Sequence, residues 1–216
     1  MGIAIVAMPT SNQQANHERS EINVMKTMPQ LLLPKLRATP QQVLGPYFLA
    51  HSPLTGKLYP SSATGSLLKI SGQVVSTDCK PLPGATVHVW LADPQGRYDN
   101  QDAQGNPLNI PLSQQLYRGR IVSDANGNYS FECLRPGNYF DSGWNLWRPA
   151  HIHIQVECAS YETLVTQLYF DDDAQNSHDI PGDDFFQPEL ALQMAPAVPA
   201  AGVAQASTFN FVLVRI

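Results

Sequence analysis

Short runs of β-forming residues, each ended by turn residues, constrain the fold of this chain more than any other feature. From about Leu68 onward these runs follow one another closely, with no long stretch of helical period between them. The runs that we predict as strands are 70–76, 85–92, 119–123, 128–134, 151–157, 164–170 and 208–215. This pattern predicts an all-β protein with a single β-sandwich domain over residues 46–216.

Turn residues mark the connections. Pro83-Gly84 separates two runs, and Asn126-Gly127 predicts a β-hairpin because both residues tolerate the positive φ of a primed turn. Pro, Ala and Gly dominate residues 194–202, which we interpret as a surface loop before the last strand. Residues 1–45 show no sustained period and predict an irregular N-terminal arm, of which about the first 25 residues are loosely held.

Composition excludes some function classes. The 216 residues carry a net charge of −5 without any basic cluster, so we expect no nucleic-acid partner. The apolar run 3–8 is short and has no basic flank, so we expect neither a signal peptide nor a membrane span, and a cytoplasmic protein. Only 14% of the residues are charged, which is consistent with surface hidden against copies of the same chain.

The three cysteines, Cys79, Cys133 and Cys158, lie far apart and form no Cys-x-x-Cys pair. This spacing argues against a zinc ribbon or a disulfide framework. We interpret the three side chains as small buried hydrophobic groups.

Two histidines stand two residues apart in the sequence Arg148-Pro149-Ala150-His151-Ile152-His153. Alternate side chains of a strand share a face, so His151 and His153 point one way while Ile152 points the other way into a core. A strand anchored in this way holds both imidazoles rigidly. The pair therefore predicts half of a metal site.

Carboxylates or tyrosines are the candidates that would complete such a site. The acidic runs 171–173 and 183–184 lie in a Gly, Pro and Asn-containing connection, which favours a solvated loop. Tyr98 and Tyr139 each follow a strand exit, and the loops of a sandwich gather at its ends. We therefore give the tyrosines more weight, while copper or zinc on the two histidines stays open as a cupin-like alternative.

Five motifs then occur in a fixed order: Gly96-Arg97-Tyr98, Gly127-Asn128-Tyr129-Ser130-Phe131, Arg135-Pro136-Gly137-Asn138-Tyr139, Trp147-Arg148-Pro149-Ala150-His151-Ile152-His153 and Thr166-Gln167-Leu168-Tyr169-Phe170. In order and spacing they resemble the intradiol ring-cleaving dioxygenases, and especially the subunits of protocatechuate 3,4-dioxygenase. The resemblance runs from about Gly45 to Phe170. It implies the β-sandwich of that family, with a prealbumin-like core.

The resemblance implies a mononuclear non-haem Fe(III) ion held by Tyr98, Tyr139, His151 and His153, with Tyr139 as the ligand that leaves when substrate arrives. A phenolate is a hard donor that suits ferric iron, and the metal charge keeps a tyrosine ionised at neutral pH. The implied reaction cleaves a small aromatic diol with O₂ between its two hydroxylated carbons and gives a cis,cis-muconate.

Two further residues have implied roles near the metal. Arg148 would stabilise negative charge on the ring, whereas an arginine elsewhere would be a surface cation over a sheet edge. Gln167 shares a strand face with Tyr169 and would lie behind the ligands, while Tyr169 is either a second such residue or simple packing.

The motif Gly45-Pro46-Tyr47-Phe48 resembles a family motif in which the arm of one subunit borders a neighbouring pocket. The competing interpretation is a turn followed by a packed aromatic side chain. Because one chain carries this motif and all four candidate ligands, we expect a homo-oligomer.

Three features remain open. Trp144 and Trp147 would either wall an aromatic pocket or pack in the core. His88 stands where the resemblance implies an acidic side chain, and we interpret it with His17, His51 and His178 as a surface or core residue. The chain lacks the helical N-terminal extension of the catechol and hydroxyquinol branch, which favours the protocatechuate-like branch.

One alternative function explains the fold without any metal. A transthyretin-like or carboxypeptidase-regulatory-like sandwich, acting as a binding or structural module, has similar strands. It leaves the coincidence of the tyrosines, the histidines and Arg148 unexplained.

Overall fold

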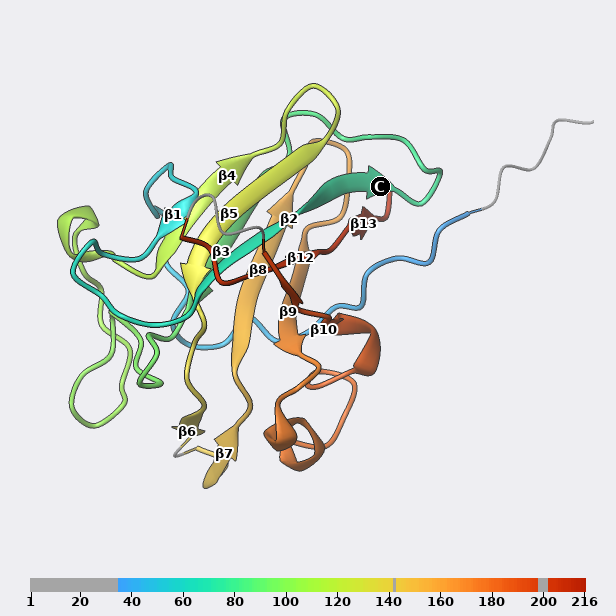
Figure 1. Cartoon of the computed structure of the whole chain (residues 1–216). Helices are drawn as coiled ribbons and strands as arrows, with labels where there is room; N and C mark the ends of the chain where they lie inside the picture. The colour runs from blue at the N-terminus through green and yellow to red at the C-terminus, as the bar shows by residue number, and fades with distance from the viewer. Residues whose placement is uncertain (1–34, 142, 198–201) are drawn as a thin grey trace, which may run out of the picture. The chain divides into compact units, whose positions relative to one another are not determined.

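The computed structural model describes residues 35–141, 143–197 and 202–216 (Figure 1). The first 34 residues of the predicted arm, with the apolar run 3–8 and His17, lie outside this range. In the described part of the chain, no helix is long and apolar enough to cross a membrane.

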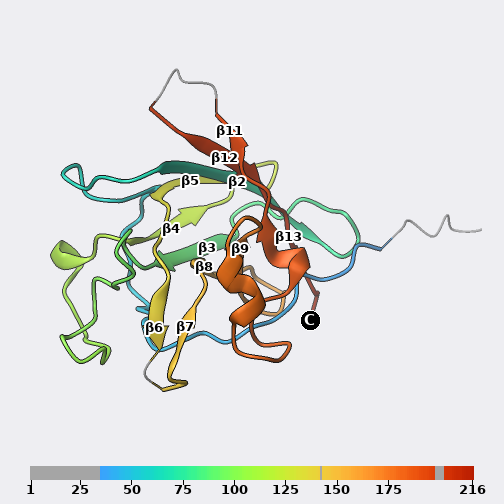
Figure 2. The same cartoon turned by 60° about the horizontal axis from the view of Figure 1, so that its bottom comes forward.

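Two sheets form the sandwich (Figures 1 and 2). Sheet I has the order β10 (Ala191–Leu192), β9 (Leu164–Phe170), β8 (His151–Glu157), β3 (Thr86–Leu91) and β4 (Arg118–Val122). Sheet II has the order β1 (Lys57–Leu58), β5 (Asn128–Leu134), β2 (Leu67–Ser76), β12 (Gln205–Thr208) and β11 (Ala195–Pro196), and β13 (Phe211–Leu213) also pairs with β2. The predicted all-β sandwich is confirmed.

A separate two-stranded ribbon, β6 (Tyr139–Asp141) with β7 (Leu146–Arg148), extends from one end of the sandwich (Figure 2). The described residues contain no α-helix. Their helical turns are three short 3₁₀ helices in connections: η1 (Leu112–Gln114), η2 (Ala174–His178) and η3 (Pro188–Leu190).

The core lies between the two sheets and follows the two-residue period of the strands. Sheet I contributes alternate apolar residues, including Val89 on β3, Ile152 on β8 and Leu168 on β9. Sheet II contributes residues such as Ile70 on β2 and Phe131 on β5. These side chains are almost completely removed from solvent, so the opposite face of sheet I is left for other side chains.

The hairpin predicted at Asn126-Gly127 is wrong. β4 pairs with β3 in sheet I, whereas β5 pairs with β2 in sheet II, so the chain crosses between the sheets at this turn. Gly127 has φ of 77° but Asn126 is not among the residues with positive φ, so the turn is not a primed one. The Asp124 carboxylate accepts hydrogen bonds from the amides of Asn126 and Asn128 and holds the reversal. Turn residues specify a reversal, but packing decides which sheet receives each strand.

The predicted last strand, 208–215, overlaps two short strands, the end of β12 at Thr208 and the whole of β13. β12 and β13 both run parallel to β2 and are separated at Phe209 and Asn210. Gly72 of β2 lies at this break, where a Cβ atom would overlap the carbonyl oxygen of Phe209. The loop predicted over residues 194–202 also contains a strand, because Ala195–Pro196 pair with β12.

The cysteine prediction holds only in part. Cys133 is fully buried and Cys158 is half-buried, but Cys79 is exposed. Cys79 lies in the turn after β2, where its amide donates to the carbonyl of Ser76 and its φ is 61°. Its place in the turn, which a sequence pattern does not reveal, keeps it out of the core.

Residues 35–48 form no strand and yet bind to both sheets. The amide of Thr39 donates to Val212 of β13, and the amide of Gln42 donates to Val165 of β9. These bonds therefore link β13 of sheet II to β9 of sheet I through the segment that precedes Gly45.

We expect Phe131→Ala to lower the free energy of unfolding by about 3–5 kcal/mol, because it leaves a cavity between the two sheets. Phe140→Ala is the matched control, since that ring is 47% exposed, and should change stability by no more than about 0.5 kcal/mol. Chemical denaturation measures both values. Equal effects of the two substitutions would contradict the assignment of the core.

Candidate active site

The outer face of sheet I carries a row of polar and aromatic side chains in register. Strand pairing places Trp90 of β3 beside His153 of β8, and His153 beside Gln167 of β9. The next pair on this face is His151 with Tyr169. Since the alternate residues of these strands fill the core, the register brings the two predicted histidines and Gln167 to one place.

The two imidazoles face each other. Their Nε2 atoms are 3.1 Å apart, and Nδ1 of His151 lies 2.7 Å from the carbonyl oxygen of Pro149. That carbonyl accepts a hydrogen bond from the Nδ1–H group, so the Nε2 lone pair of His151 points toward His153. The Trp90 ring stacks on His153 with centroids 4.9 Å apart.

Two loops bring the tyrosines to the histidines. Tyr98 lies in the loop after β3 and Tyr139 begins β6. A Cβ atom at Gly96, which has φ of 79°, would overlap the carbonyl oxygen of Asn138, so only glycine allows the two loops to touch. The Tyr98 hydroxyl consequently lies 3.5 Å from Nε2 of His151, and the ring centroids of Tyr98 and Tyr139 are 5.7 Å apart.

The segment Gly45–Phe48 covers this cluster within the same chain. Tyr47 stacks on Tyr98 with ring centroids 4.2 Å apart, and Phe48 packs edge-on against Trp90. Gly45, with φ of 73°, lies so close to His153 that a Cβ atom would be 3.0 Å from the ring carbon Cε1. The turn with a packed aromatic is thus present, and in this chain it lies against the chain's own candidate site.

Arg148 lies inside the site and is not a surface cation. It is the register partner of Tyr139 in the β6–β7 ribbon and is 2% exposed. Its guanidinium donates to both carboxylate oxygens of Asp179, at 2.6 and 3.1 Å, and to Oε1 of Gln167 at 3.0 Å. It also donates to the Tyr169 hydroxyl at 3.2 Å, so Tyr169 is part of this network and does more than fill space.

Two aspartates that the sequence did not indicate hold the arginines of this region. Asp179 pairs with Arg148, and Asp99, next to Tyr98, pairs with Arg118. Arg118 also donates to the carbonyl of Tyr47 at 2.8 Å and thereby ties the covering segment to sheet I. Neither pair has a local spacing by which a sequence pattern would reveal it.

Burial controls the protonation of the site. It raises the pKa of Tyr139 to about 12 despite the opposing effect of Arg148, and it raises the pKa of Tyr98 well above 10. It also lowers the pKa of His151 and His153 well below 6.5, and the nearby Arg148 lowers both further. Without an added positive charge, the site therefore holds neutral phenols and neutral imidazoles.

This donor set fits a transition-metal ion. Two nitrogens bound to one ion at about 2.1 Å and at a right angle would lie about 3 Å apart, close to the Nε2 separation in this structure. Nδ1 of His153 is buried without a hydrogen-bond partner in the described structure, so this ring is held by packing against Trp90 and Gly45. Phenol oxygens are hard donors that suit a trivalent ion. No group of three or more His, Cys, Asp or Glu side chains that could hold a metal occurs among the described residues.

A pocket of about 410 Å³ adjoins this cluster. Tyr47 and Tyr139 form part of its wall. The other described lining residues are Pro46, Gln101, Ala103, Gln104, Gly105, Phe140, Asp141 and Gly143. This volume lies within the usual range of small-molecule sites, about 300–1,000 Å³.

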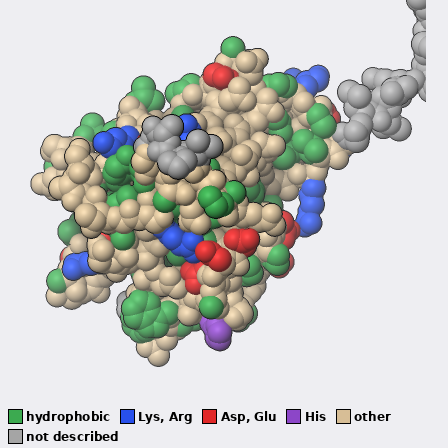
Figure 3. Space-filling model, viewed as in Figure 1, with side chains coloured by type: hydrophobic (Ala, Val, Ile, Leu, Met, Phe, Trp, Pro, Cys, Tyr) green, Lys and Arg blue, Asp and Glu red, His purple; other side chains and the backbone are tan. Residues whose placement is uncertain are grey.

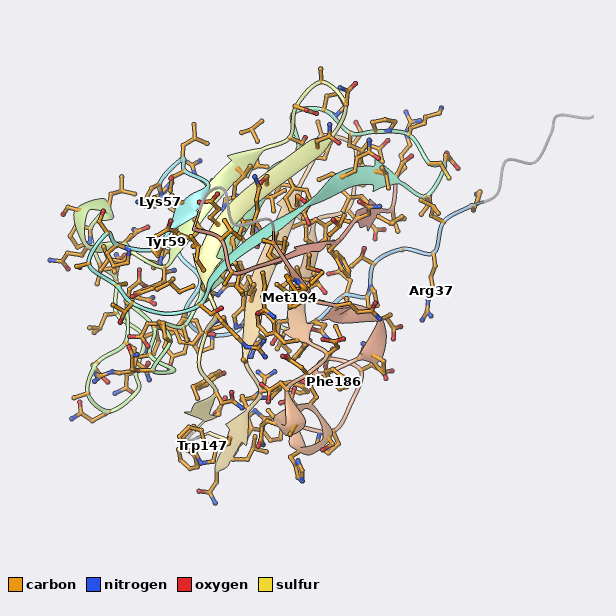
Figure 4. The ribbon with its side chains drawn as sticks, viewed as in Figure 1. Arg37, Lys57, Tyr59, Trp147, Phe186 and Met194 are labelled. Atoms are coloured by element: carbon orange, nitrogen blue, oxygen red, sulfur yellow. The ribbon has the colours of Figure 1, made fainter. Side chains whose placement is uncertain are left out.

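The structure does not bring the remaining sequence candidates into the site. His51 and His178 are exposed, and His88 lies farther along β3, where its Nε2 is 3.5 Å from a Glu157 oxygen. Trp144 and Trp147 are mostly exposed, so packing of these rings in the core is wrong. Figure 4 shows Trp147 on the β6–β7 ribbon, away from the sandwich.

The acidic runs 171–173 and 183–184 lie in connections between strands, as predicted, and one of their residues, Asp173, supports the site. Asp171, Asp183 and Asp184 are exposed, whereas Asp173 accepts a hydrogen bond from the amide of Ala150 at 2.9 Å. Asp173 thus supports the chain just before His151. On the face shown in Figure 3, the described acidic and basic side chains lie among each other without a continuous basic surface.

A protein-family model described as "Dioxygenase" matches residues 43–215. The chain belongs to the intradiol dioxygenase family. It is 35% identical to a catechol 1,2-dioxygenase of Candida albicans over 61% of this chain and 46% of that enzyme. It is 28% identical to a chlorocatechol 1,2-dioxygenase of Pseudomonas sp. strain P51 over 79% of this chain and 68% of that enzyme.

A solved relative has a similar fold. The dioxygenase domain of a dioxygenase and carbohydrate-binding protein fusion from the cellulolytic bacterium Streptomyces sp. SirexAA-E is 31% identical, with a TM-score of 0.65. The match covers 83% of this chain and 100% of that domain. By contrast, the match to the Candida albicans enzyme spans about half of its length.

The pairing of Arg148 with Asp179 predicts a large cost for Asp179→Asn, because the substitution leaves a buried guanidinium without its counter-charge. We expect a loss of about 3–5 kcal/mol in the free energy of unfolding. Asp172→Asn is the control, since Asp172 pairs with Arg135 at the surface and should contribute about 0–1 kcal/mol. If denaturation shows equal losses, the buried pair is not a structural support of the site.

Proposed function

We propose that this chain is a mononuclear non-haem Fe(III) intradiol dioxygenase. It would cleave an aromatic diol with O₂ between the two hydroxylated carbons and give a cis,cis-muconate-type product that contains both oxygen atoms. The observation that carries the proposal is the meeting of two buried Nε2 atoms, 3.1 Å apart, with the Tyr98 hydroxyl 3.5 Å from one of them. Relatives named for catechol and chlorocatechol 1,2-dioxygenation support the reaction class.

The proposed ligands are Tyr98, Tyr139, His151 and His153. When bound, ferric iron would supply a Lewis acid for the diol oxygens and the positive charge that ionises both phenols. Neutral imidazoles are the form of histidine that binds metal, and burial favours that form here. The raised pKa values of the tyrosines mean that their ionisation would depend on the metal charge.

The two tyrosines have different surroundings, which supports different roles. Tyr98 is held under the Tyr47 ring, whereas Tyr139 lines the pocket. Tyr139 would therefore be the phenolate that accepts a proton from the incoming diol at its Oη atom, and Tyr98 would remain in place.

Arg148 and Gln167 would act on the bound ring. Asp179, Gln167 and Tyr169 already hold the Arg148 guanidinium in place. The guanidinium would therefore not have to reorient when negative charge develops on the diol. Gln167, the register partner of His153, holds one side of that guanidinium. Since one chain carries the covering segment and all four proposed ligands, the assembly that we propose is a homo-oligomer.

The ligand proposal predicts the colour of the iron-loaded protein. Tyrosinate bound to Fe(III) gives a visible charge-transfer band, and Tyr98→Phe should weaken or shift it by removing one phenolate. Tyr161→Phe is the control, because Tyr161 lies near Arg215 at another part of the fold. Absorption spectra of the three proteins test the proposal, and an unchanged band in Tyr98→Phe would exclude Tyr98 as a ligand.

The activity itself predicts oxygen consumption with a catechol. Iron-loaded protein should take up O₂ in equal amount to the diol and form a muconate, which oxygen-electrode and absorbance measurements follow. Removal of the iron with a reductant and a chelator should abolish the uptake, and restoring iron should return it. A coloured protein that consumes no O₂ with any diol would refute the activity but leave the metal site standing.

A further inference from the structure

The pocket beside Tyr139 has an acidic wall. Of the described residues that line it, Asp141 is the one with a charged side chain. Oδ1 of Asp141 accepts hydrogen bonds from the amides of Gly143 and Trp144, which fix the carboxylate at the ribbon end. Phe140 and Gly143, close to Asp141 in the chain, are exposed, so this wall of the pocket reaches solvent.

The two buried arginines of this region are already neutralised. Arg148 is paired with Asp179, and Arg118 is paired with Asp99. The Asp102 carboxylate lies in the pocket-lining loop, where it binds the amides of Gln104 and Asn106. The pocket region therefore has an excess of negative charge. Burial is the main cause of the raised pKa of Tyr47, and the Asp141 and Asp102 charges raise it further.

We propose that this pocket selects catechols whose ring substituent is uncharged or cationic over catechols that carry a ring carboxylate. The inference rests on the proposed function and names the substrate class of that same site. A substrate carboxylate held here would lose water, meet the Asp141 charge and find no cation among the described lining residues. A cationic substituent would instead be attracted, so the preference opposes the protocatechuate-like branch that the sequence favoured.

Three catechols with a substituent at the same ring position test the proposal: 4-methylcatechol, 3,4-dihydroxybenzylamine and protocatechuate. We expect kcat/KM of the iron-loaded full chain to be lower for protocatechuate than for the other two by about tenfold or more. One repulsion between like charges in a partly screened site has about this size. Raising the ionic strength should narrow the gap, because salt screens a partly exposed charge.

A variant separates pocket charge from the intrinsic reactivity of each ring. Asp141→Asn keeps an oxygen for the amides of Gly143 and Trp144 and removes only the charge. The substitution should raise kcat/KM for protocatechuate, relative to 4-methylcatechol, by about tenfold. It should lower kcat/KM for 3,4-dihydroxybenzylamine relative to 4-methylcatechol. Asp78→Asn is the control, because Asp78 is exposed in the turn after β2 and its loss makes the same change in net charge. It should leave the kcat/KM ratios between the three catechols unaltered.

Binding provides a readout that does not need turnover. Shifts of the visible charge-transfer band with each catechol give dissociation constants, which should follow the same order. If the band responds with this order but O₂ is not consumed, the selectivity stands and the proposed function fails. Ratios that do not change in Asp141→Asn, or that change equally in Asp78→Asn, would overturn the selectivity.

Discussion

The alternation of side chains along β8 is the constraint on which the site depends. Ile152, Ile154 and Val156 are completely buried between the sheets, so His151 and His153 must emerge on the other face. A slip of one residue would exchange the two sets and place imidazoles in the core. Strand pairing with β3 and β9 opposes such a slip, because both neighbours share the same apolar face.

Two arginine–aspartate pairs are buried where the outer face of sheet I is covered. The site is covered by Gly45–Phe48 and by the loops of Tyr98 and Tyr139, and Arg118 and Arg148 in this region each have their own aspartate. A lone buried guanidinium would be costly, whereas a paired one with further hydrogen bonds is tolerated. The same pairing leaves Arg148 oriented toward Gln167 and Tyr169 without adding net positive charge.

Local sequence patterns predicted the longer strands, whereas very short strands and contacts between distant residues could not be predicted from them. The bounds of β5, β8 and β9 agree with the predicted runs: each has seven residues, and polar and apolar residues alternate along β5 and β8. The β6–β7 ribbon was not predicted, since strands of three residues are too short to show a period. Tyr98 and Tyr139 were indicated by their place at strand exits and by the family resemblance, not by any period of their own. Asp179 was missed because its contact with Arg148 spans 31 positions.

The amino-acid sequence by itself determined the β-rich runs, the face on which each strand residue lies and the identity of the four candidate ligands. These depend on backbone geometry, which repeats every two residues, and on motifs of contiguous residues. Only the tertiary structure decided that β4 and β5 join different sheets, that Gly96 lets the two tyrosine loops touch, and that Asp141 lines the pocket. Each of these depends on atoms brought together from distant parts of the chain, where close packing rather than local preference selects the arrangement.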